Sequence, residues 1–503
     1  MTDRTGVPKR IRPLEEVEAF DSVVDVIVCG FGGAGACAAI EARAAGVEVM
    51  VLEHASGFGG STAMSAGEMY LGGGTRLQKQ QGFDDTPANM LAYMQQSLGD
   101  NGDPERIRAF VDNSVSHFEW LEAQGVVFND DFYPQRTVCN PDGCSLQYSG
   151  NEKSHPFTTV ASVAPRGHIA SVPAGAGQIG GATLMGVLGG NVENSGATVH
   201  YDCRVTALVQ DRAGRVVGVV ARMDNREHVF GARRGVVLTA GGFCMNEAMT
   251  AQYLPTLHDT GIRHGNPNDR GDGILMGIDA GGAAINMGEA LAVLAYYPPA
   301  DLTYGIFVNA QGQRFVNEDI YISRIYHYAA AQRDSRIYMF IDNAHYDRSE
   351  YVPGAELVAV GETVAEVEQE AGLPEGALQA TVDFYNRHAA QGRDPLFQKS
   401  ADWLQPFETA PYALVSYDLD RIEPRYVTLG GLKVRTTGEV QTVHGDEVPG
   451  LYAAGRTCAG IPRDNLGYCS GFSVGDATMF GRFAGRQVAA NAPVDVSVVE
   501  AVA

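Results

Sequence analysis

The stretch Val23–Glu53, VVDVIVCGFGGAGACAAIEARAAGVEVMVLE, decides the fold of this chain. It begins with a short apolar run rich in β-branched residues, which is typical of a buried parallel strand. A glycine turn, GFGGAG, follows at residues 30–35, and the alanine-rich segment after it predicts a helix ending at Gly46. A second apolar run ends at Glu53. Strand, glycine turn, helix and strand within about 30 residues form a βαβ unit.

The spacing of the glycines in this unit points to a bound dinucleotide. Gly30 permits a tight turn, Gly32 lets the backbone approach a pyrophosphate, and Gly35 lets the helix pack on the strand. The phosphates would then lie at the positive N-terminal end of the helix. Glu53 would accept hydrogen bonds from the adenosine ribose. The alternative is a glycine turn in an α/β domain that binds no nucleotide.

Further glycine turns favour FAD over NAD. The segment Gly59–Gly67, GGSTAMSAG, begins soon after the second strand, and strand-to-glycine turns recur at Thr239–Gly242 and Gly450–Arg456. Such turns along one chain suit a long dinucleotide that crosses the domain. One complete βαβ fingerprint argues against a separate nicotinamide domain. Because Gly59–Gly67 holds no histidine for a covalent link, we expect FAD to be bound non-covalently.

Composition and charge exclude several classes of protein. Among 503 residues there are 61 glycines, about 12% against a usual ~7%, with no three-residue period that would indicate collagen. Lys and Arg total 37 and Asp and Glu total 60, a net charge of −23. Nucleic acids and anionic membranes require a basic face, so neither is an expected partner. We also expect no membrane span, since no apolar run approaches 18 residues.

The eight cysteines form no CxxC pair and have no histidine cluster beside them. This pattern predicts a reducing compartment, no disulfide framework and no structural metal. The segment Met1–Phe20 is polar and lacks the apolar core of a signal peptide. We therefore expect a cytoplasmic location.

The residue composition of the chain changes twice after the βαβ unit. Residues 87–124 predict a helix, whereas residues 128–170 lack a regular pattern. From Val293 tyrosine and phenylalanine become frequent, and the glycine-rich pattern returns at Leu429. The change indicates an insertion within one nucleotide-binding domain. The predicted fold is of the α/β class, a two-part Rossmann-like FAD-binding domain (15–292 and 427–495) with an inserted α+β catalytic or capping domain (293–426).

Five motifs together resemble the fumarate reductase/succinate dehydrogenase flavoprotein superfamily, and the likeness extends over residues 20–490. The motifs are GFGGAG (30–35), GGSTAMSAG (59–67), TAGG (239–242), TLGGL (428–432) and GLYAAGR (450–456). The resemblance implies a two-part FAD domain with an inserted cap. Dicarboxylate reductases of that superfamily carry a late histidine and arginine before Gly-Gly-Asn. Here IPRDNLGYCSG (461–471) lacks the histidine, which argues against fumarate as substrate.

The late segment is similar to the flavin-dependent 3-ketosteroid dehydrogenases, in particular the Δ4-(5α) type. Its Tyr468-x-Ser470-Gly471 matches a Tyr-x-Ser-Gly turn that faces the flavin in those enzymes, and Tyr321 follows the cap motif at 312–319. The runs at 70–75 and 164–168 also look like that subgroup. Arg463-Asp464-Asn465 departs from the small, glycine-rich stretch of the family.

The cofactor contacts that the glycine pattern and this resemblance imply can be given residue by residue. His54 is expected to pack near the adenine, and Ser473 and Val474 to contact the flavin. The full set is Gly30, Gly32, Gly33, Ala34, Gly35, Glu53, His54, Gly60, Ser61, Thr62, Ser65, Ala66, Gly67, Val205, Ala240, Gly241, Asp272, Gly455, Arg456, Ser473 and Val474.

The resemblance also implies a reaction. Desaturation beside a ketone needs a polarised carbonyl, a base for the α-proton and a hydride acceptor, and the flavin is the acceptor. We assign Tyr468 as the base, Ser470 as its proton relay and Tyr321 as donor to the ketone oxygen, with the two tyrosines open to exchange. Gly471 contributes to substrate binding through its turn. The alternative for either tyrosine is aromatic packing at the domain interface.

Arg463 has two interpretations. It forms an ion pair with Asp464 or another neighbouring acid, or it binds a substrate carboxylate. The second would make the substrate a small keto acid such as 4-oxocyclohexanecarboxylate. The leading prediction is an FAD-dependent desaturase of a hydrophobic cyclic ketone, a 3-ketosteroid that gains a C4–C5 double bond. Its alternatives are a desaturase of smaller ketones, a fumarate-reductase-like alkene reductase, and a flavin-containing binding or redox-sensing protein.

Overall fold

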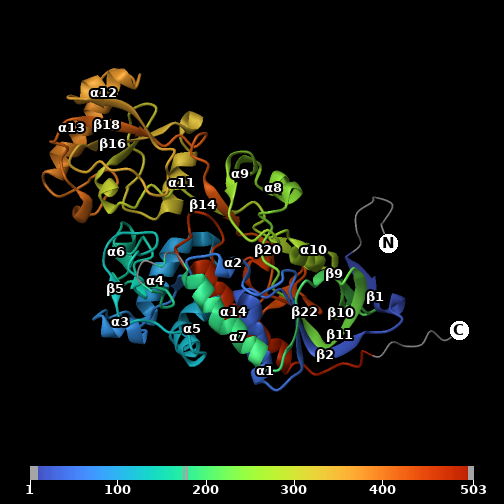
Figure 1. Cartoon of the computed structure of the whole chain (residues 1–503). Coiled ribbons are helices and arrows are strands. Elements are labelled where there is room, and N and C mark those ends of the chain that lie inside the picture. The colour runs from blue at the N-terminus through green and yellow to red at the C-terminus, as the bar shows by residue number, and fades with distance from the viewer. Residues whose placement is uncertain (1–9, 174–175, 177–178, 497–503) are drawn as a thin grey trace.

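The computed structural model describes residues 10–173, 176 and 179–496, so residues 1–9 of the N-terminal segment discussed above lie outside the described part. Within it, nine strands form the main sheet, at the right of Figure 1. The strands are β1 (Ile11–Pro13), β2 (Ser22–Cys29), β3 (Val49–Leu52), β8 (Thr198–His200), β9 (Arg204–Gln210), β10 (Val216–Met223), β11 (Arg226–Leu238), β21 (Glu439–Gln441) and β22 (Glu447–Ala453).

The centre of this sheet is parallel, in the order β22-β11-β2-β3-β8. β10 pairs antiparallel with β9 and with the first half of β11. Strand β2, helix α1 (Gly33–Ala44) and strand β3 form the βαβ unit that the sequence predicted. β22 comes from the end of the chain, so the sheet joins the two glycine-rich regions. The predicted α/β class is therefore confirmed.

Helix α1 is covered by α14 (Phe472–Ala490) and by α7 (Gly180–Asn194), as the centre of Figure 1 shows. The contact between α1 and α14 is very close. A Cβ on Gly481 would lie 2.5 Å from the Ala34 oxygen, and one on Gly485 would lie 2.3 Å from the Ala38 oxygen. Side chains at these positions would push the helices apart. The first and last long helices of the chain thus share one core.

Between β3 and α7 the chain forms a layer that contacts the start of α14, where the Tyr70 N–H donates to the Gly471 oxygen. The predicted helix at 87–124 is divided into α4 (Pro87–Leu98) and α5 (Pro104–Ala123), because Gly99 at φ 55° ends the first. The segment predicted as irregular contains short paired strands. This layer consists of α2 (Gly60–Ala63), β4 (Met69–Tyr70), α3 (Arg76–Gln80), β5 (Phe132–Tyr133), β6 (Leu146–Gln147), α6 (Phe157–Val160) and β7 (Gly167–His168).

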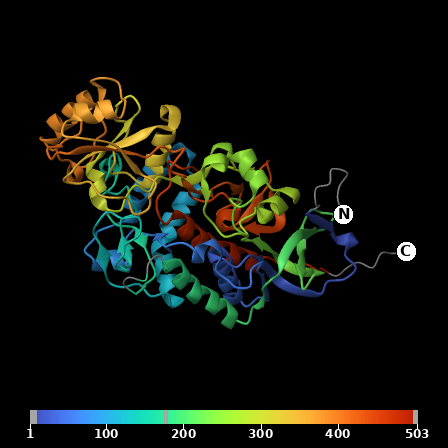
Figure 2. The ribbon, with the colours of Figure 1, turned by 45° about the horizontal axis from the view of Figure 1, so that its top comes forward.

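A separate antiparallel sheet, β15-β16-β18-β17, lies within the region predicted as the insertion. Figures 1 and 2 both show these yellow and orange segments at the upper left, away from the main sheet. The cap comprises β15 (Ile306–Asn309), α11 (Ile322–Ala330), β16 (Ile337–Asp342), β17 (Glu356–Gly361), α12 (Val364–Glu370), α13 (Ala377–Ala389) and β18 (Tyr412–Ser416). The domain bounds given above stay a prediction.

The chain enters and leaves the cap on neighbouring strands. β14 (Ala290–Val293) runs antiparallel to β19 (Arg425–Thr428), with Ala290 opposite Thr428. The remaining elements lie on the main-sheet side of this crossing. They are α8 (Glu247–Tyr253), α9 (Pro255–Thr260), β12 (Ile262–Arg263), α10 (Asp272–Asp279), β13 (Ala284–Ile285) and β20 (Gly431–Leu432).

Three further observations concern the described part of the chain. None of its helices has the length and apolar character needed to cross a membrane. All eight cysteines are free thiols. No cluster of three histidine, cysteine, aspartate or glutamate side chains suited to a metal ion occurs among the residues described.

Candidate active site

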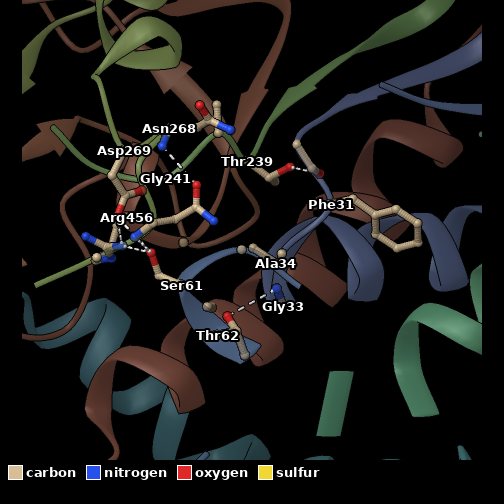
Figure 3. Close-up of a pocket in the computed structure, with 18 of the residues that line it drawn as sticks. Phe31, Gly33, Ala34, Ser61, Thr62, Thr239, Gly241, Asn268, Asp269 and Arg456 are labelled. Carbon is tan, nitrogen blue, oxygen red and sulfur yellow. Dashed lines mark hydrogen bonds and ion pairs between the residues drawn. The ribbon is translucent and has the colours of Figure 1, made fainter. Parts of the chain in front are cut away.

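The glycine turns meet around one cavity (Figure 3). A Cβ on Gly30 would lie 2.6 Å from the Thr239 oxygen, and one on Gly35 would lie 2.0 Å from the Gly30 oxygen, so both glycines are required by packing. At Gly32 the nearest atom to such a Cβ is the Gly59 oxygen, 3.7 Å away. Gly32 and the N-terminal end of α1 instead border the cavity. The cap residue Gly32 has no side chain, and the Gly33 N–H donates to the Thr62 hydroxyl at 3.2 Å. The positive end of the helix still suits a pyrophosphate.

Glu53 stands at the end of β3 and borders the same cavity. Its carboxylate is oriented by the main chain, because the Phe31 N–H donates to Oε2 at 2.6 Å and the Ala55 N–H donates to Oε1 at 2.7 Å. His54 also lines the cavity. A carboxylate held in this way presents its remaining lone pairs to ribose hydroxyls, the role expected for this residue.

Three segments far apart in sequence are joined at the cavity by Ser61, Asp269 and Arg456. The Ser61 hydroxyl donates to Asp269 at 2.8 Å, and the Arg456 guanidinium donates to Ser61 at 2.8 Å and forms an ion pair with Asp269. Ser61 and Arg456 were predicted to contact the cofactor, but Asp269 was not. No local sequence motif marks Asp269, because the residues that it binds, Ser61 and Arg456, lie far from it in the sequence.

Most of the residues predicted to bind the cofactor border this cavity. Those that line it are Gly30, Gly32, Gly33, Ala34, Glu53, His54, Gly60, Ser61, Thr62, Ser65, Val205, Ala240, Gly241, Asp272, Gly455, Arg456, Ser473 and Val474. Gly35, Ala66 and Gly67 lie behind it. A Cβ on Gly67 would lie 2.2 Å from the Gly181 nitrogen, and the Ala66 oxygen lies 2.3 Å from where a Cβ on Gly180 would stand. These three residues form close backbone contacts in the cavity wall.

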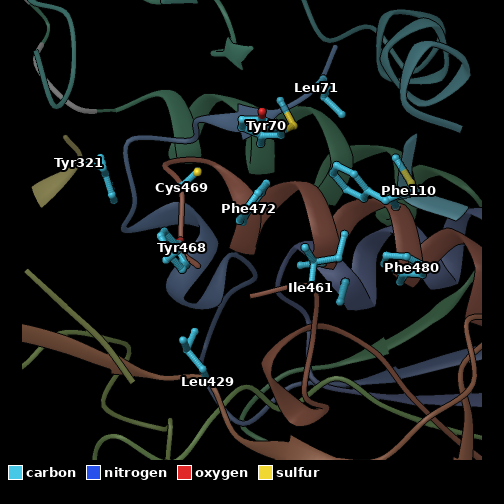
Figure 4. Close-up of a cluster of buried hydrophobic side chains, with 14 of the residues drawn as sticks. Tyr70, Leu71, Phe110, Tyr321, Leu429, Ile461, Tyr468, Cys469, Phe472 and Phe480 are labelled. Atoms are coloured by element: carbon cyan, nitrogen blue, oxygen red, sulfur yellow. The ribbon is translucent and has the colours of Figure 1, made fainter. Parts of the chain in front are cut away.

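The rings of Tyr321 and Tyr468 stack on each other, and both residues belong to the buried cluster drawn in Figure 4. Their ring centroids are 6.3 Å apart with an interplanar angle of 19°. Tyr468 lines the cavity, and its hydroxyl donates to the Ser473 hydroxyl at 3.0 Å. Burial raises the pKa of Tyr468 and raises that of Tyr321 well above its ordinary value. Both phenols are therefore protonated at neutral pH.

Residues outside the cap hold Tyr321 in place. The Tyr321 N–H donates to the Asn151 side-chain oxygen at 2.7 Å. Gly150, at φ 120°, packs so closely that a Cβ there would lie 2.5 Å from the ring. Arg136 donates to three successive carbonyl oxygens, those of residues 318–320, just before Tyr321. The tyrosine of the cap is thus positioned by residues outside the cap.

Ser470 has a different partner from the one expected. Its hydroxyl donates to Glu68 Oε2 at 2.5 Å, whereas Tyr468 bonds to Ser473. Gly471, at φ 87°, begins α14 immediately after Ser470, which brings Ser473 in the first turn of that helix to Tyr468. The predicted direct relay from Tyr468 to Ser470 is absent from the observed contacts.

Glu68 was missed by the sequence reasoning. It is 5% exposed, and burial raises the pKa of its carboxyl to about 8. A signal was available, because Glu68 is the single charged residue in the glycine-rich run 57–74. An acid among small and apolar residues is rarely buried without a reason.

Arg463 does not line the cavity. Its guanidinium forms an ion pair with Asp103 at 3.0 Å and donates to the Gly460 oxygen at 2.9 Å. Asp464 instead accepts the Gly467 N–H at 2.6 Å. The ion-pair interpretation holds with a different acid from Asp464, and the carboxylate-binding interpretation loses support. Gly471 packs against β4, where a Cβ would lie 2.5 Å from the Tyr70 nitrogen.

Comparisons with known proteins identify the family of this chain. The FAD binding domain family matches residues 25–465. The crystal structure of 3-ketosteroid-Δ4-(5α)-dehydrogenase from Rhodococcus jostii RHA1 in complex with 4-androstene-3,17-dione is 40% identical in sequence. It has a TM-score of 0.89, and the match covers 95% of this chain and 99% of that chain.

Two curated relatives are more distant. The 3-oxo-5-alpha-steroid 4-dehydrogenase of Comamonas testosteroni is 28% identical over 506 residues, covering 88% of this chain and 94% of the relative. An NADH:fumarate oxidoreductase of Klebsiella pneumoniae is 27% identical over 93% of this chain, which spans 48% of that protein's length. The chain therefore belongs to the FAD binding domain family, among flavin-dependent oxidoreductases that include 3-oxosteroid dehydrogenases and fumarate reductases, and its cofactor is FAD.

Proposed function

We propose that this protein desaturates a 3-ketosteroid between C4 and C5. One observation carries the proposal: Tyr321 from the cap stacks on Tyr468 from the last part of the chain, and Tyr468 lines the FAD cavity two residues before Ser470. The likeness to the Rhodococcus jostii enzyme, which is named for this reaction, supports it. The polar groups suit a ketone, because the hydroxyls of Tyr468 and Ser470 are hydrogen-bond donors.

Bound FAD would supply the hydride acceptor of the reaction. The residues of this chain bind the ketone and take up the proton. Tyr468 borders the cavity, and burial keeps its phenol protonated, so it is suited to donate a hydrogen bond to the ketone oxygen. This donation stabilises the negative charge that develops on that oxygen when the neighbouring carbon loses its proton.

A raised pKa makes either tyrosine a poor base, which favours a division of roles different from the one expected from the sequence. Ser470 is the better proton acceptor because its own proton already points to a carboxylate. Tyr321 lies close to Ser470, because its ring stacks on that of Tyr468, two residues before Ser470 in the chain. Tyr321 and Ser470 together would therefore face the carbon beside the ketone.

The test uses the purified, FAD-loaded protein and a saturated 3-ketosteroid with an artificial electron acceptor. Without oxygen and without the acceptor, we expect the steroid to bleach the flavin. When the artificial acceptor is added, we expect the enzyme to reduce it. The matched control is the same steroid with a 3-hydroxyl group, which offers no ketone to polarise and should leave the flavin oxidised. Turnover of simple cyclohexanones or of an oxocyclohexanecarboxylate, with none of the steroid, would contradict the steroid assignment.

A further inference from the structure

The carboxyl of Glu68 is buried behind the proposed substrate site and faces Ser470. Oε2 accepts the Ser470 hydroxyl at 2.5 Å and the Gln147 side-chain amide at 3.1 Å, and Oε1 accepts the Ser149 hydroxyl at 3.2 Å. Gly167 leaves room for this carboxyl, because a Cβ there would lie 2.1 Å from Oε1. A carboxyl in this setting has one direct contact with the catalytic turn, through Ser470.

The surroundings of Glu68 raise the pKa of its carboxyl toward neutral pH, where it can gain and lose a proton. Burial is the largest influence on its pKa, and the nearby carboxyl of Glu152 raises that pKa further. Glu152 itself is held by the N–H groups of Ser149 and Gly150. The other titratable side chains that interact electrostatically with Glu68 are Cys139, Tyr297, Tyr321 and Tyr468.

The flanking charged and titratable residues are already engaged elsewhere. Arg166 forms a buried ion pair with Asp85 at 2.7 Å, and His168 contacts the Thr75 hydroxyl at 2.9 Å. Among the described residues, no lysine or arginine forms an ion pair with Glu68. A carboxylate paired with arginine stays ionised, whereas an unpaired buried one gains a proton readily.

We propose that Glu68 is the terminal acceptor of the substrate proton, reached through Ser470. The C–H bond beside the ketone breaks as the Ser470 oxygen takes the proton, and the original Ser470 proton moves to Oε2 of Glu68. The carboxylate becomes a carboxylic acid, the C–H electron pair stays on the substrate, and the neighbouring carbon loses its hydride to FAD. This inference rests on the proposed function, and Glu68 acts through Ser470 rather than by touching substrate.

The pH dependence follows from the charge that an acceptor needs. Only ionised Glu68 can accept a proton, and the pKa of its carboxyl in the resting enzyme is about 8. The rate of flavin reduction should therefore rise with pH through that region. At neutral pH most of the enzyme would carry the unreactive acid form.

The decisive variant is Glu68→Gln, measured by stopped-flow reduction of the flavin with a 3-ketosteroid across a pH series. We expect the rate of flavin reduction to fall by about 10²–10⁴-fold, as for removal of a general base. The rise in rate near pH 8, the pH limb, should be lost, and the affinity for the steroid should not change. Glu152→Gln is the matched control, since Glu152 is an equally buried glutamate without a contact to Ser470. It should keep the maximum rate reached at high pH and move the pH limb to lower pH by removing a nearby negative charge.

Two additional measurements separate proton acceptance from a structural role. Glu68→Asp keeps the carboxyl on a side chain that is one methylene shorter. It should be faster than Glu68→Gln and should again show a pH limb. Infrared titration of the resting FAD-loaded enzyme, without substrate, should reveal a carboxylic-acid band that disappears as the pH rises through 8. That band should be missing in Glu68→Gln and present in Ser470→Ala.

The outcomes are distinguishable. If the wild type reduces its flavin with a 3-ketosteroid and Glu68→Gln keeps the rate and the pH limb, the inference is wrong and the proposed function stands. If no 3-ketosteroid bleaches the wild-type flavin, the proposed function is wrong and the inference falls with it. The wild-type infrared spectrum gives a direct test that does not depend on how well the variant folds. If it shows no carboxylic-acid band that titrates near pH 8, Glu68 is not the proton acceptor.

Discussion

The cofactor cavity and the cluster of Tyr321, Tyr468, Ser470 and Glu68 lie next to each other but are built differently. The cavity is lined in large part where strands end in glycine turns and α1 begins. The proposed catalytic cluster is made of side chains from distant segments, including one from the cap. A cradle of backbone recognises phosphates by geometry, whereas the cluster depends on individual hydroxyl and carboxyl groups.

The two regions also differ in how their charges are settled. At the cavity, Arg456 pairs directly with Asp269, so each charged group has a partner of opposite charge. At the cluster, Glu68 is held by neutral donors, and burial raises its pKa to about 8. Fixed charges suit binding, while a carboxyl that changes protonation near neutral pH suits proton transfer. Variants in each region should therefore fail in different ways.

The largest expected effect is at the cavity, in Gly35→Ala. The new Cβ would lie 2.0 Å from the Gly30 oxygen, so α1 must move from β2 and the phosphate cradle is lost. We expect purified protein without FAD, measured by flavin absorbance per chain, and a loss of about 1–3 kcal/mol in the free energy of unfolding. Gly57→Ala is the control, since no atom lies within 4 Å of its Cβ. A Gly35→Ala protein with a full complement of FAD would contradict the cradle.

At the cluster, Tyr468→Phe should separate binding from chemistry. The ring and its packing remain, so FAD content should match the wild type. Loss of the hydroxyl that donates to the ketone should slow flavin reduction by about 10²–10³-fold, the loss found for one donor to a developing oxyanion. Tyr328→Phe, in which the tyrosine is 36% exposed, controls for loss of a phenol. Near-normal reduction by Tyr468→Phe would remove this tyrosine from the mechanism.

The smallest effect is expected outside both regions, in Arg463→Ala. Its ion pair with Asp103 links the late segment to the start of α5, so the free energy of unfolding should fall by about 1 kcal/mol. The KM for a neutral ketosteroid should not change. Asp103→Asn should cause a similar fall, and the double variant should lose less than the sum. A raised KM confined to a keto acid would instead restore the carboxylate-binding interpretation.

The sequence predicted the cofactor region better than the catalytic cluster. The βαβ prediction was confirmed by β2, α1 and β3, because strand and helix periodicity and glycine spacing are local properties. Tyr468 and Tyr321 were found through a resemblance, but their hydrogen bonds were not. Glu68 takes its significance from Ser470, some 400 residues away, and from burial, so its raised pKa follows from tertiary structure alone.

The contact of Arg136 with the carbonyl oxygens of residues 318–320 has a consequence for how the enzyme is divided. One guanidinium from the FAD-binding part sets the position of the segment that carries Tyr321. A shortened protein without the cap would keep every glycine turn of the cofactor cavity yet hold only half of the tyrosine pair. Such a fragment would be a flavin carrier, and rejoining the cap at the β14–β19 crossing would turn the carrier back into an enzyme.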